Sequence, residues 1–289
     1  MPSISQLNVY PIKSCAAIAR DAVRLTHYGL EYDRNWMVID ARGRFISQRT
    51  HARLALVQPA FEGDALAVRA PGMDTLRLAL DAAALEGAPV VAASVWGDTV
   101  PALDAGQEAE RWFSDFLGEP VRLVRFEPGY ERTASRDWTG EVAANVYFAD
   151  GFPLLVIGQA SLDDLNARLA SKGVDPIPMN RFRPNLVIEG MPAYEEDYTE
   201  SLSIAAASGE IALRIVKPCT RCPIPTIDQA RGMPDPRWPT EPTDTLSAYR
   251  ADSRMDGALT FGQNAIILAG VGGILEVGQT VDAELRFDA

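Results

Sequence analysis

The chain is poor in the residues that most metal and disulfide sites require. Its 289 residues include only three cysteines and two histidines. An odd and small number of cysteines argues against a disulfide scaffold and is typical of a reducing compartment. A tetrahedral zinc site, which needs four ligands from short Cys or His motifs, has few candidates here.

Long hydrophobic runs are also missing. The first residues, Met1–Gln6, have neither the basic start nor the apolar stretch of a signal peptide. Elsewhere Asp, Glu, Arg or Gly interrupts the apolar stretches before they reach the ~20 residues of a membrane helix. We therefore expect a soluble, cytoplasmic protein without membrane insertion.

The chain has fewer basic than acidic residues. The 27 Lys and Arg residues face 39 Asp and Glu residues, which gives a net charge of -12. Such a surface repels phosphate backbones, so nucleic acid is not an expected partner. The length and a hydrophobic content of 47% are sufficient for two moderate cores, and we expect two domains.

Chemistry is concentrated in the stretch Lys217–Asp228, which contains Cys219 and Cys222. A thiolate is the nucleophile and soft-metal ligand, and we expect the neighbouring Lys217 and Arg221 to favour this charged form. Three interpretations of the Cys-x-x-Cys pair remain open: a zinc site, a redox pair or buried free thiols.

Each interpretation makes a different demand. Zinc needs further ligands, and those available, Cys15, His27 and His51, lie far upstream. A thioredoxin-like pair opens a helix, but Pro223 and Pro225 prevent a helix from continuing. Packing as free thiols suits Cys15 and Cys219 better than Cys222, whose flanking prolines and arginine indicate a polar loop.

Most of the remaining pattern is β. Short apolar runs separated by Gly-bearing turns predict hairpins in the first third, which indicates a sandwich or barrel. Their ranges are Trp36–Ser47, Leu56–Val68 and Val95–Val100, the last with Gly97-Asp98 as the turn. Further strands are predicted at Val121–Phe126, Pro153–Ile157, Leu186–Ile188, Leu202–Ile204, Ile211–Ile215 and Ile266–Leu268.

Helical spacing appears twice. The first helix follows Asp104, which with Gln107 forms the predicted N-terminal cap, and it ends at Gly118. Its core face comprises Ala109, Trp112, Phe113, Phe116 and Leu117. The second helix is predicted to start at a Ser161 cap and to end at Gly173. Its core face comprises Leu162, Leu165 and Leu169.

Several motifs, taken in order, resemble one family. The segment Lys217–Cys222, followed by Thr226 and Asp228, is similar to the signature of MOSC domains, the molybdenum cofactor sulfurase C-terminal family. The other matching segments are Tyr10–Cys15, Asp33–Trp36, Arg181–Asn185, Glu195–Asp197 and Phe261–Gln263. Within that family the chain resembles the mitochondrial amidoxime reducing component and its bacterial relatives.

The resemblance implies a fold and a division of the chain. The expected fold is α+β and mostly β, with an N-terminal β-rich domain packed on a C-terminal MOSC β-barrel domain that has a few helices. We place the N-terminal domain at residues 1–118 and the MOSC domain at residues 119–289.

The resemblance also implies a molybdenum-molybdopterin cofactor between the domains. By similarity Cys222 is the molybdenum ligand and a catalytic residue, and Cys219 is a packing neighbour. Asp197, or less so Glu196, is expected to deliver protons or to bind a metal-bound water. The expected cofactor-binding residues are Lys13, Arg34, Arg49, Asp150, Gly151, Arg183, Asn185, Thr220, Arg221 and Cys222.

Two departures from the family pattern qualify this picture. Hydroxyl residues that relatives place after Asp150 are replaced by Gly151-Phe152-Pro153, so backbone groups would make the contacts there. No cysteine follows Cys222, so the chain cannot form the ferredoxin-like module of some relatives. Electrons are expected from a separate protein, ferredoxin-like or cytochrome b5-like with a reductase.

The function implied is the reduction of small N-hydroxylated compounds, namely amidoximes, hydroxylamines and N-hydroxylated bases. A role as a carrier of molybdenum cofactor or sulfur, without turnover, is the alternative.

Overall fold

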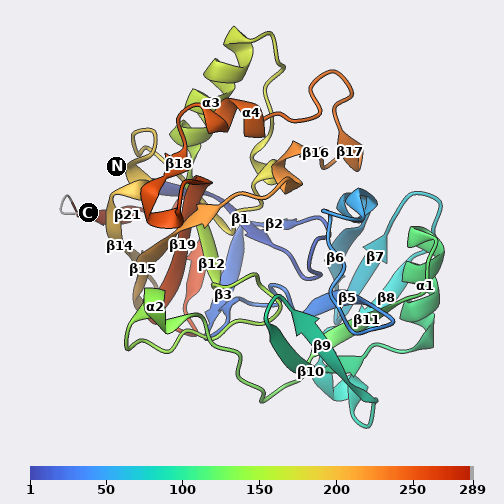
Figure 1. The fold of residues 1–289 in the computed structure, drawn as a ribbon. Coiled ribbons are helices and arrows are strands. Elements are labelled where there is room, and N and C mark those ends of the chain that lie inside the picture. Colours follow the sequence, from blue (N-terminus) through green and yellow to red (C-terminus); the bar gives the residue numbers. More distant parts are fainter. Residues whose placement is uncertain (287–289) are drawn as a thin grey trace.

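The secondary structure is mostly β, as predicted. The computed structural model describes residues 1–286, with 41% of the chain in strands and 19% in helices. Figure 1 shows the strands gathered into a large sheet on one side and smaller sheets on the other.

The large sheet is a half-barrel that carries most of the C-terminal part of the chain. Its strands are β1 (Ser3–Val9), β2 (Ile18–Arg20), β12 (Leu154–Gly158), β13 (Leu186–Glu189), β14 (Thr199–Ala206), β15 (Gly209–Thr220), β18 (Ala251–Asp252), β19 (Ala258–Ala269) and β21 (Val281–Leu285). The order is β2-β1-β13-β12-β19-β15-β14-β21, with β18 on β19. All these pairings are antiparallel except β12 with β13.

Smaller sheets build the rest. A four-stranded sheet has the order β5 (Trp36–Asp40), β11 (Val121–Phe126), β10 (Asp98–Asp104), β9 (Val90–Val95). Two three-stranded sheets consist of β6 (Gln58–Glu62), β7 (Ala65–Arg69) and β8 (Leu76–Ala79), and of β20 (Ile274–Glu276), β3 (Ala22–Thr26) and β4 (Gly29–Leu30). The pair β16 (Ile227–Asp228) and β17 (Met233–Pro234) is separate.

The helices are short and lie at the edges of the sheets (Figure 1). They are α1 (Gln107–Leu117), α2 (Arg136–Thr139), α3 (Gln159–Ser171) and α4 (Thr243–Ser247). One-turn 3-10 helices are η1 (Ala52–Leu56), η2 (Ala82–Leu85), η3 (Met179–Arg181), η4 (Glu195–Asp197), η5 (Ile224–Thr226) and η6 (Ser253–Met255). No helix within residues 1–286 has the length and apolar character needed to cross a membrane.

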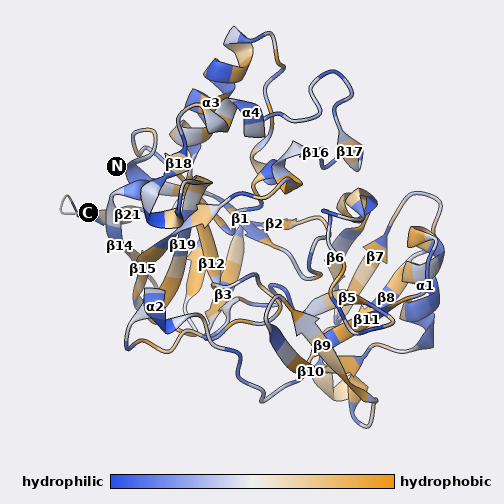
Figure 2. Ribbon diagram, in the orientation of Figure 1, coloured by the Kyte–Doolittle hydropathy of each residue, from blue (hydrophilic) through white to orange (hydrophobic). Residues whose placement is uncertain are grey.

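Apolar periodicity explains why these elements form where they do. In α1 the predicted face is buried, with Ala109, Trp112, Phe113 and Phe116 at most 7% exposed. In Figure 2 this helix carries both polar and apolar residues, as an amphipathic helix at the edge of a core should. The leucines of α3, Leu162, Leu165 and Leu169, are buried in the same way. Both predicted core faces are therefore confirmed, except that Leu117 at the end of α1 is only half-buried.

The predicted helix caps are wrong. The residue before α1 is Gly106, at φ 93°. Asp104 is still the last residue of β10, and its carboxylate accepts a hydrogen bond from the Gly106 amide. The residue before α3 is Gly158. Ser161 lies inside the first turn, buried, where its hydroxyl donates to Glu196 at 2.8 Å instead of capping the helix.

The second and third hairpins form as β6–β7 and β9–β10. In the third, Asp98 pairs with Val95, so the turn is Trp96-Gly97, one residue earlier than predicted. The first is reduced to a single bridge between Ile39 and Phe45.

Sheet membership does not follow the division predicted at Gly118. Strand β11 begins at Val121, after that point, yet it pairs with β5 and β10 of the N-terminal part. Strand β1 at the start of the chain pairs with β13 of the large sheet. The first strand is thereby built into the C-terminal sheet, which brings the Tyr10–Cys15 motif next to it.

Candidate functional site

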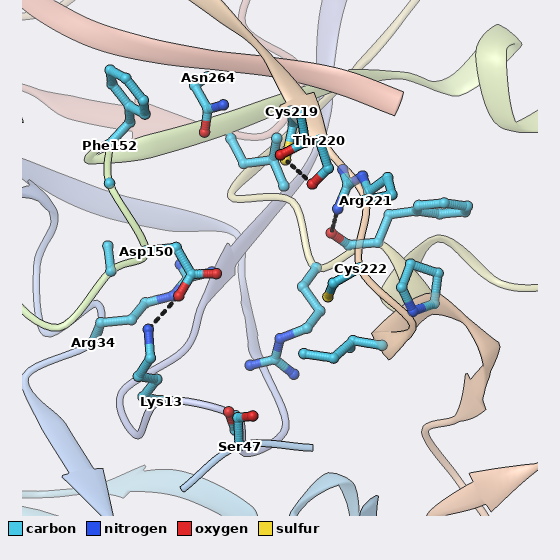
Figure 3. A pocket seen from close by; sticks show the side chains of 18 of the residues that line it. Lys13, Arg34, Ser47, Asp150, Phe152, Cys219, Thr220, Arg221, Cys222 and Asn264 are labelled. Carbon is cyan, nitrogen blue, oxygen red and sulfur yellow. Dashed lines mark hydrogen bonds and ion pairs between the residues drawn. The ribbon is translucent and has the colours of Figure 1, made fainter. Parts of the chain in front are cut away.

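A cavity lined by both parts of the chain collects the predicted cofactor-binding residues (Figure 3). From the N-terminal part it is lined by Lys13, Ser14, Arg34, Phe45, Ser47, Arg49 and Trp96. The lining residues from the C-terminal part include Asp150, Gly151, Phe152, Arg181, Phe182, Arg183, Asn185, Cys219, Thr220, Arg221, Cys222 and Asn264. Every predicted cofactor-binding residue is in this set, and Asp197 is not.

Cys222 is presented by a rigid turn at the end of β15. The strand ends at Thr220, and Pro223 immediately precedes η5. Between them the Arg221 guanidinium donates to the carbonyls of Phe261, at 2.8 Å from Nε, and Phe182, at 2.9 Å from Nη1. Because its donors are taken up by backbone carbonyls, Arg221 anchors the loop that carries the cysteine.

A bulge in β19 allows this anchoring. Gly262 follows Phe261 at φ 77°, and a Cβ on it would come within 2.6 Å of Cγ1 of Ile157 on β12. Glycine is therefore required where β19 approaches β12. The Phe261-Gly262-Gln263 motif thus supports the cysteine loop from behind.

The environment of Cys219 combines two opposing influences on its thiol. Burial raises the pKa of the Cys219 thiol, and nearby Arg221 offsets this only in part. Lys217 does not line the cavity, and its Nζ lies 5.0 Å from the centroid of the Trp138 ring. Arg221 and Lys217 both favour the Cys219 thiolate, as expected, but the loss of solvent outweighs them and the net shift of the pKa is upward.

Other features bear on the three interpretations of the cysteine pair. All three cysteines are free thiols, and Cys15 is fully buried with its pKa raised by burial to about 12, as expected for a packing residue. Among residues 1–286 no group of three or more His, Cys, Asp or Glu side chains could hold a metal ion. A zinc site would thus lack the protein ligands that it needs.

Two arginines share one aromatic ring. The guanidinium carbons of Arg34 and Arg183 lie over the ring of Tyr10, 4.3 and 4.4 Å from its centroid. Arg34 also forms an ion pair with the buried Asp33. Arg183 makes no hydrogen bond or ion pair with any side chain in residues 1–286, although burial lowers its pKa and so disfavours its charge.

A second group surrounds Asp150. Lys13 forms an ion pair with the Asp150 carboxylate, which also accepts from the Trp96 indole at 3.0 Å (Figure 3 shows the Lys13 contact). The Asp150 side chain is mostly exposed, but its place in the cavity removes enough solvent to oppose ionisation; Lys13 and Trp96 outweigh this and hold its pKa well below the usual range. The Arg49 guanidinium stacks over Trp96 at 4.3 Å and has no partner carboxylate in residues 1–286.

The segment that carries Asp150 is held by two buried cations. Arg132 donates to the carbonyls of Tyr147 at 2.9 Å, Ala149 at 2.6 Å and Asp150 at 3.3 Å. Lys13 donates to the remaining carbonyl, that of Phe148, at 2.7 Å. Four consecutive carbonyls are thus bound, and the backbone at Gly151 enters the cavity from a fixed position.

Asn185 has a largely structural role. Its side-chain oxygen accepts from the Leu155 amide at 3.2 Å, and its nitrogen donates to the carbonyl of Asn8 at 3.2 Å. It lines the cavity, and these bonds also link β1 to β12 within the large sheet.

Asp197 lies elsewhere. Its carboxylate forms an ion pair with Arg250 at 2.7 Å and accepts from Gln263 at 2.7 Å. It lines a second cavity with Arg250, Asp252 and Arg254, among other residues. Glu196 is 1% exposed and accepts from Ser161 and the Gly158 amide, so its role is to hold the start of α3.

Several lining residues were missed at the sequence level. Ser14 lies within the Tyr10–Cys15 motif, which was its only signal, and Ser47 had only its closeness in sequence to Arg49. Phe45, Trp96 and Asn264 had none, because they come from a bridge, a hairpin turn and a mid-strand position.

Comparison with known families accounts for nearly the whole chain. The MOSC N-terminal beta barrel domain matches residues 1–120, and the MOSC domain matches residues 143–282. The chain belongs to the MOSC family. The predicted resemblance is thereby confirmed.

Individual relatives cover both domains. Mitochondrial amidoxime reducing component 2 of Bos taurus is 36% identical over 255 residues, which is 86% of this chain and 72% of that protein. Mitochondrial amidoxime-reducing component 1 of Mus musculus is 34% identical over 89% of this chain and 74% of its own length. Molybdenum cofactor sulfurase of Bos taurus is 31% identical over 79% of this chain but only 27% of its own length.

Proposed function

We propose that this chain is a molybdenum cofactor-dependent oxidoreductase that reduces N-hydroxylated compounds, among them amidoximes, hydroxylamines and N-hydroxylated bases. Each oxygen removed consumes two electrons and two protons and leaves as water. The proposal is supported by similarity to amidoxime reducing components over most of their length.

One observation carries the proposal: a half-buried cysteine and unpaired guanidinium groups line the same cavity. The chain has a net charge of -12, yet six cations line this cavity with a single carboxylate, Asp150. Arg49, which is exposed, and Arg183, which is half-buried, form no ion pair with a carboxylate in residues 1–286, so their charge is available to an anion that enters the cavity. A pterin cofactor with a phosphate and a thiolate-bound metal fits this donor set.

The residues have separate roles in this proposal. Cys222 would be the protein ligand of molybdenum, because its thiol is in the cavity on an anchored loop. Arg34, Arg49, Arg183 and Lys13 would bind the phosphate and pterin. Asp150 and the backbone at Gly151 would accept and donate the hydrogen bonds that orient the pterin.

The bound cofactor would supply the two-electron chemistry. Aromatic side chains at Phe45, Trp96 and Phe152 give the same cavity apolar surface against which a small substrate can lie. Asp197 is not included, because its carboxylate is bound to Arg250 in another cavity. Electrons would come from a separate ferredoxin-like or cytochrome b5-like protein with its reductase.

The test is to express the chain in a host that makes the cofactor and to measure molybdenum content and benzamidoxime reduction with an artificial electron donor. The Cys222→Ser variant should lose both molybdenum and turnover. Cys219→Ala is the matched control, with the same residue type in the same loop, and should keep most of both. Full molybdenum content and turnover in Cys222→Ser would contradict the proposal.

Similarity to molybdenum cofactor sulfurase favours one alternative, a carrier of cofactor or sulfur. A carrier would contain stoichiometric molybdenum but reduce no N-hydroxylated compound, or would transfer sulfur in a way that depends on Cys219.

A further inference from the structure

Tyr10 is buried at the point where two parts of the chain meet. Its ring is 1% exposed, its hydroxyl donates to the carbonyl of Pro184 at 3.2 Å, and its amide donates to Asp33 at 2.8 Å. The buried ring lies between the segment that carries Arg34 and the segment that carries Arg183.

Both arginines that contact this ring have an unusual backbone conformation. Arg34 has φ 52° and Arg183 has φ 60°, in the left-handed region that residues with a side chain seldom adopt. Such conformations persist only when surrounding contacts hold them. Two strained arginines directed to one aromatic ring indicate that their arrangement matters to the site.

The Tyr10 ring offsets the repulsion between Arg34 and Arg183. Two guanidinium groups near each other repel, and burial lowers the pKa of Arg183 with Arg34 contributing in the same direction. An aromatic face attracts a cation through its quadrupole. Burial raises the pKa of Tyr10 to about 12, so the ring stays a neutral phenol at physiological pH.

We propose that Tyr10 is a positioning residue that holds Arg34 and Arg183 as one unit for binding a phosphate group. The ring, rather than the hydroxyl, is the part that acts. The inference rests on the proposed function only for the identity of the ligand, and inorganic phosphate is a sufficient probe.

The experiment compares two isosteric rings in the full-length, cofactor-free chain. One variant is Tyr10→Phe, and the other carries pentafluorophenylalanine at position 10, which reverses the ring quadrupole at nearly the same volume. Calorimetric titration with inorganic phosphate at constant ionic strength gives the dissociation constants. Tyr10→Phe should stay within about twofold of the unsubstituted chain, whereas the fluorinated ring should weaken binding about tenfold, ~1.4 kcal/mol.

A matched control tests whether fluorination itself is the cause. Phe61 carries another cation over its ring, Arg20 at 5.5 Å, and does not line the cavity. Pentafluorophenylalanine at position 61 should leave phosphate affinity unchanged. Thermal unfolding of each variant checks that the binding data refer to folded protein.

The outcomes separate this inference from the proposed function. Equal affinities for the two rings at position 10, a large loss with Tyr10→Phe, or no phosphate binding by the unsubstituted chain would each overturn the role of Tyr10. Phosphate binding that follows the ring quadrupole, in a chain that never takes up molybdenum, would support Tyr10 and refute the molybdenum proposal.

Discussion

The two cavities of this protein contain the same kinds of charged residue and differ in how those residues are paired. In the second cavity Arg250 binds Asp197 at 2.7 Å and Arg254 binds Asp252 at 2.8 Å. In the first, Arg49 and Arg183 face the cavity without a carboxylate partner in residues 1–286. Charge that is already neutralised stabilises a fold, whereas charge left open is available for a ligand.

This difference bears on Asp197, which was predicted from a family motif and lies in the second cavity. An acidic residue in a family motif has the right chemistry for proton transfer, but its partners decide whether it can act. Arg250 and Gln263 occupy both oxygens of Asp197. Asp197 is therefore an ion-paired carboxylate beside the second cavity, not a free one.

The largest expected effect comes from neutralising one arginine in each cavity. Arg183→Gln should weaken binding of inorganic phosphate by about 100-fold, because a charge-assisted contact of ~1.5–3 kcal/mol is lost. Arg254→Gln, in the second cavity, should leave it unchanged. Calorimetric titration with phosphate measures the dissociation constants of both variants. Equal losses of affinity would mean that ion pairing of the arginines does not distinguish the two cavities.

An intermediate effect is expected on stability from Asp197→Asn. This change leaves Arg250 without its partner at a place where both side chains are only 11–12% exposed. The free energy of unfolding should fall by about 2 kcal/mol. Molybdenum content and turnover per molybdenum should not change.

Denaturant unfolding checks the stability of Asp197→Asn. Asp175→Asn is the control, since its ion pair with Arg237 is exposed at 82% and 68%, and it should change stability by less than about 0.5 kcal/mol. A loss of turnover in folded, loaded Asp197→Asn protein would restore its catalytic role.

The smallest effect concerns the pH dependence of stability at Asp150. Because its pKa in the folded chain is below that of the unfolded chain, the carboxylate contributes stability above about pH 4. That contribution is lost as the pH falls below this range. Asp150→Asn should therefore be less stable than the unsubstituted chain at pH 7, and the difference should be clearly smaller at pH 2.

Solvent screening keeps this difference small, since the Asp150 side chain is 67% exposed. Unfolding midpoints at the two pH values give the comparison. A difference that grows as the pH falls would contradict the assigned direction of the shift.

Much of the fold could be predicted from local pattern. The faces of α1 and α3 and two of the three hairpins follow from hydrophobic periodicity and turn residues, which act over a few neighbouring positions. The caps at Asp104 and Ser161 failed because a strand end and a tertiary hydrogen bond to Glu196 took those side chains first.

The sequence predicted which residues belong to the candidate site but not how their side chains are arranged. Family motifs identified Cys222 and Arg183, yet nothing local indicated that Tyr10 would carry two guanidinium groups or that Trp96 would reach Asp150. These contacts join residues from different sheets. A periodic pattern contains no information about such pairings.

By itself the sequence determined that this is a mostly β, acidic MOSC protein with a reactive residue type in a proline-bounded loop. Only the tertiary structure decided which charges remain unpaired, since an arginine in the sequence does not reveal whether a carboxylate lies beside it. Arg183 and Arg250 are the same residue type, but Arg183 lies over the Tyr10 ring without an ion pair, whereas Arg250 is paired with Asp197.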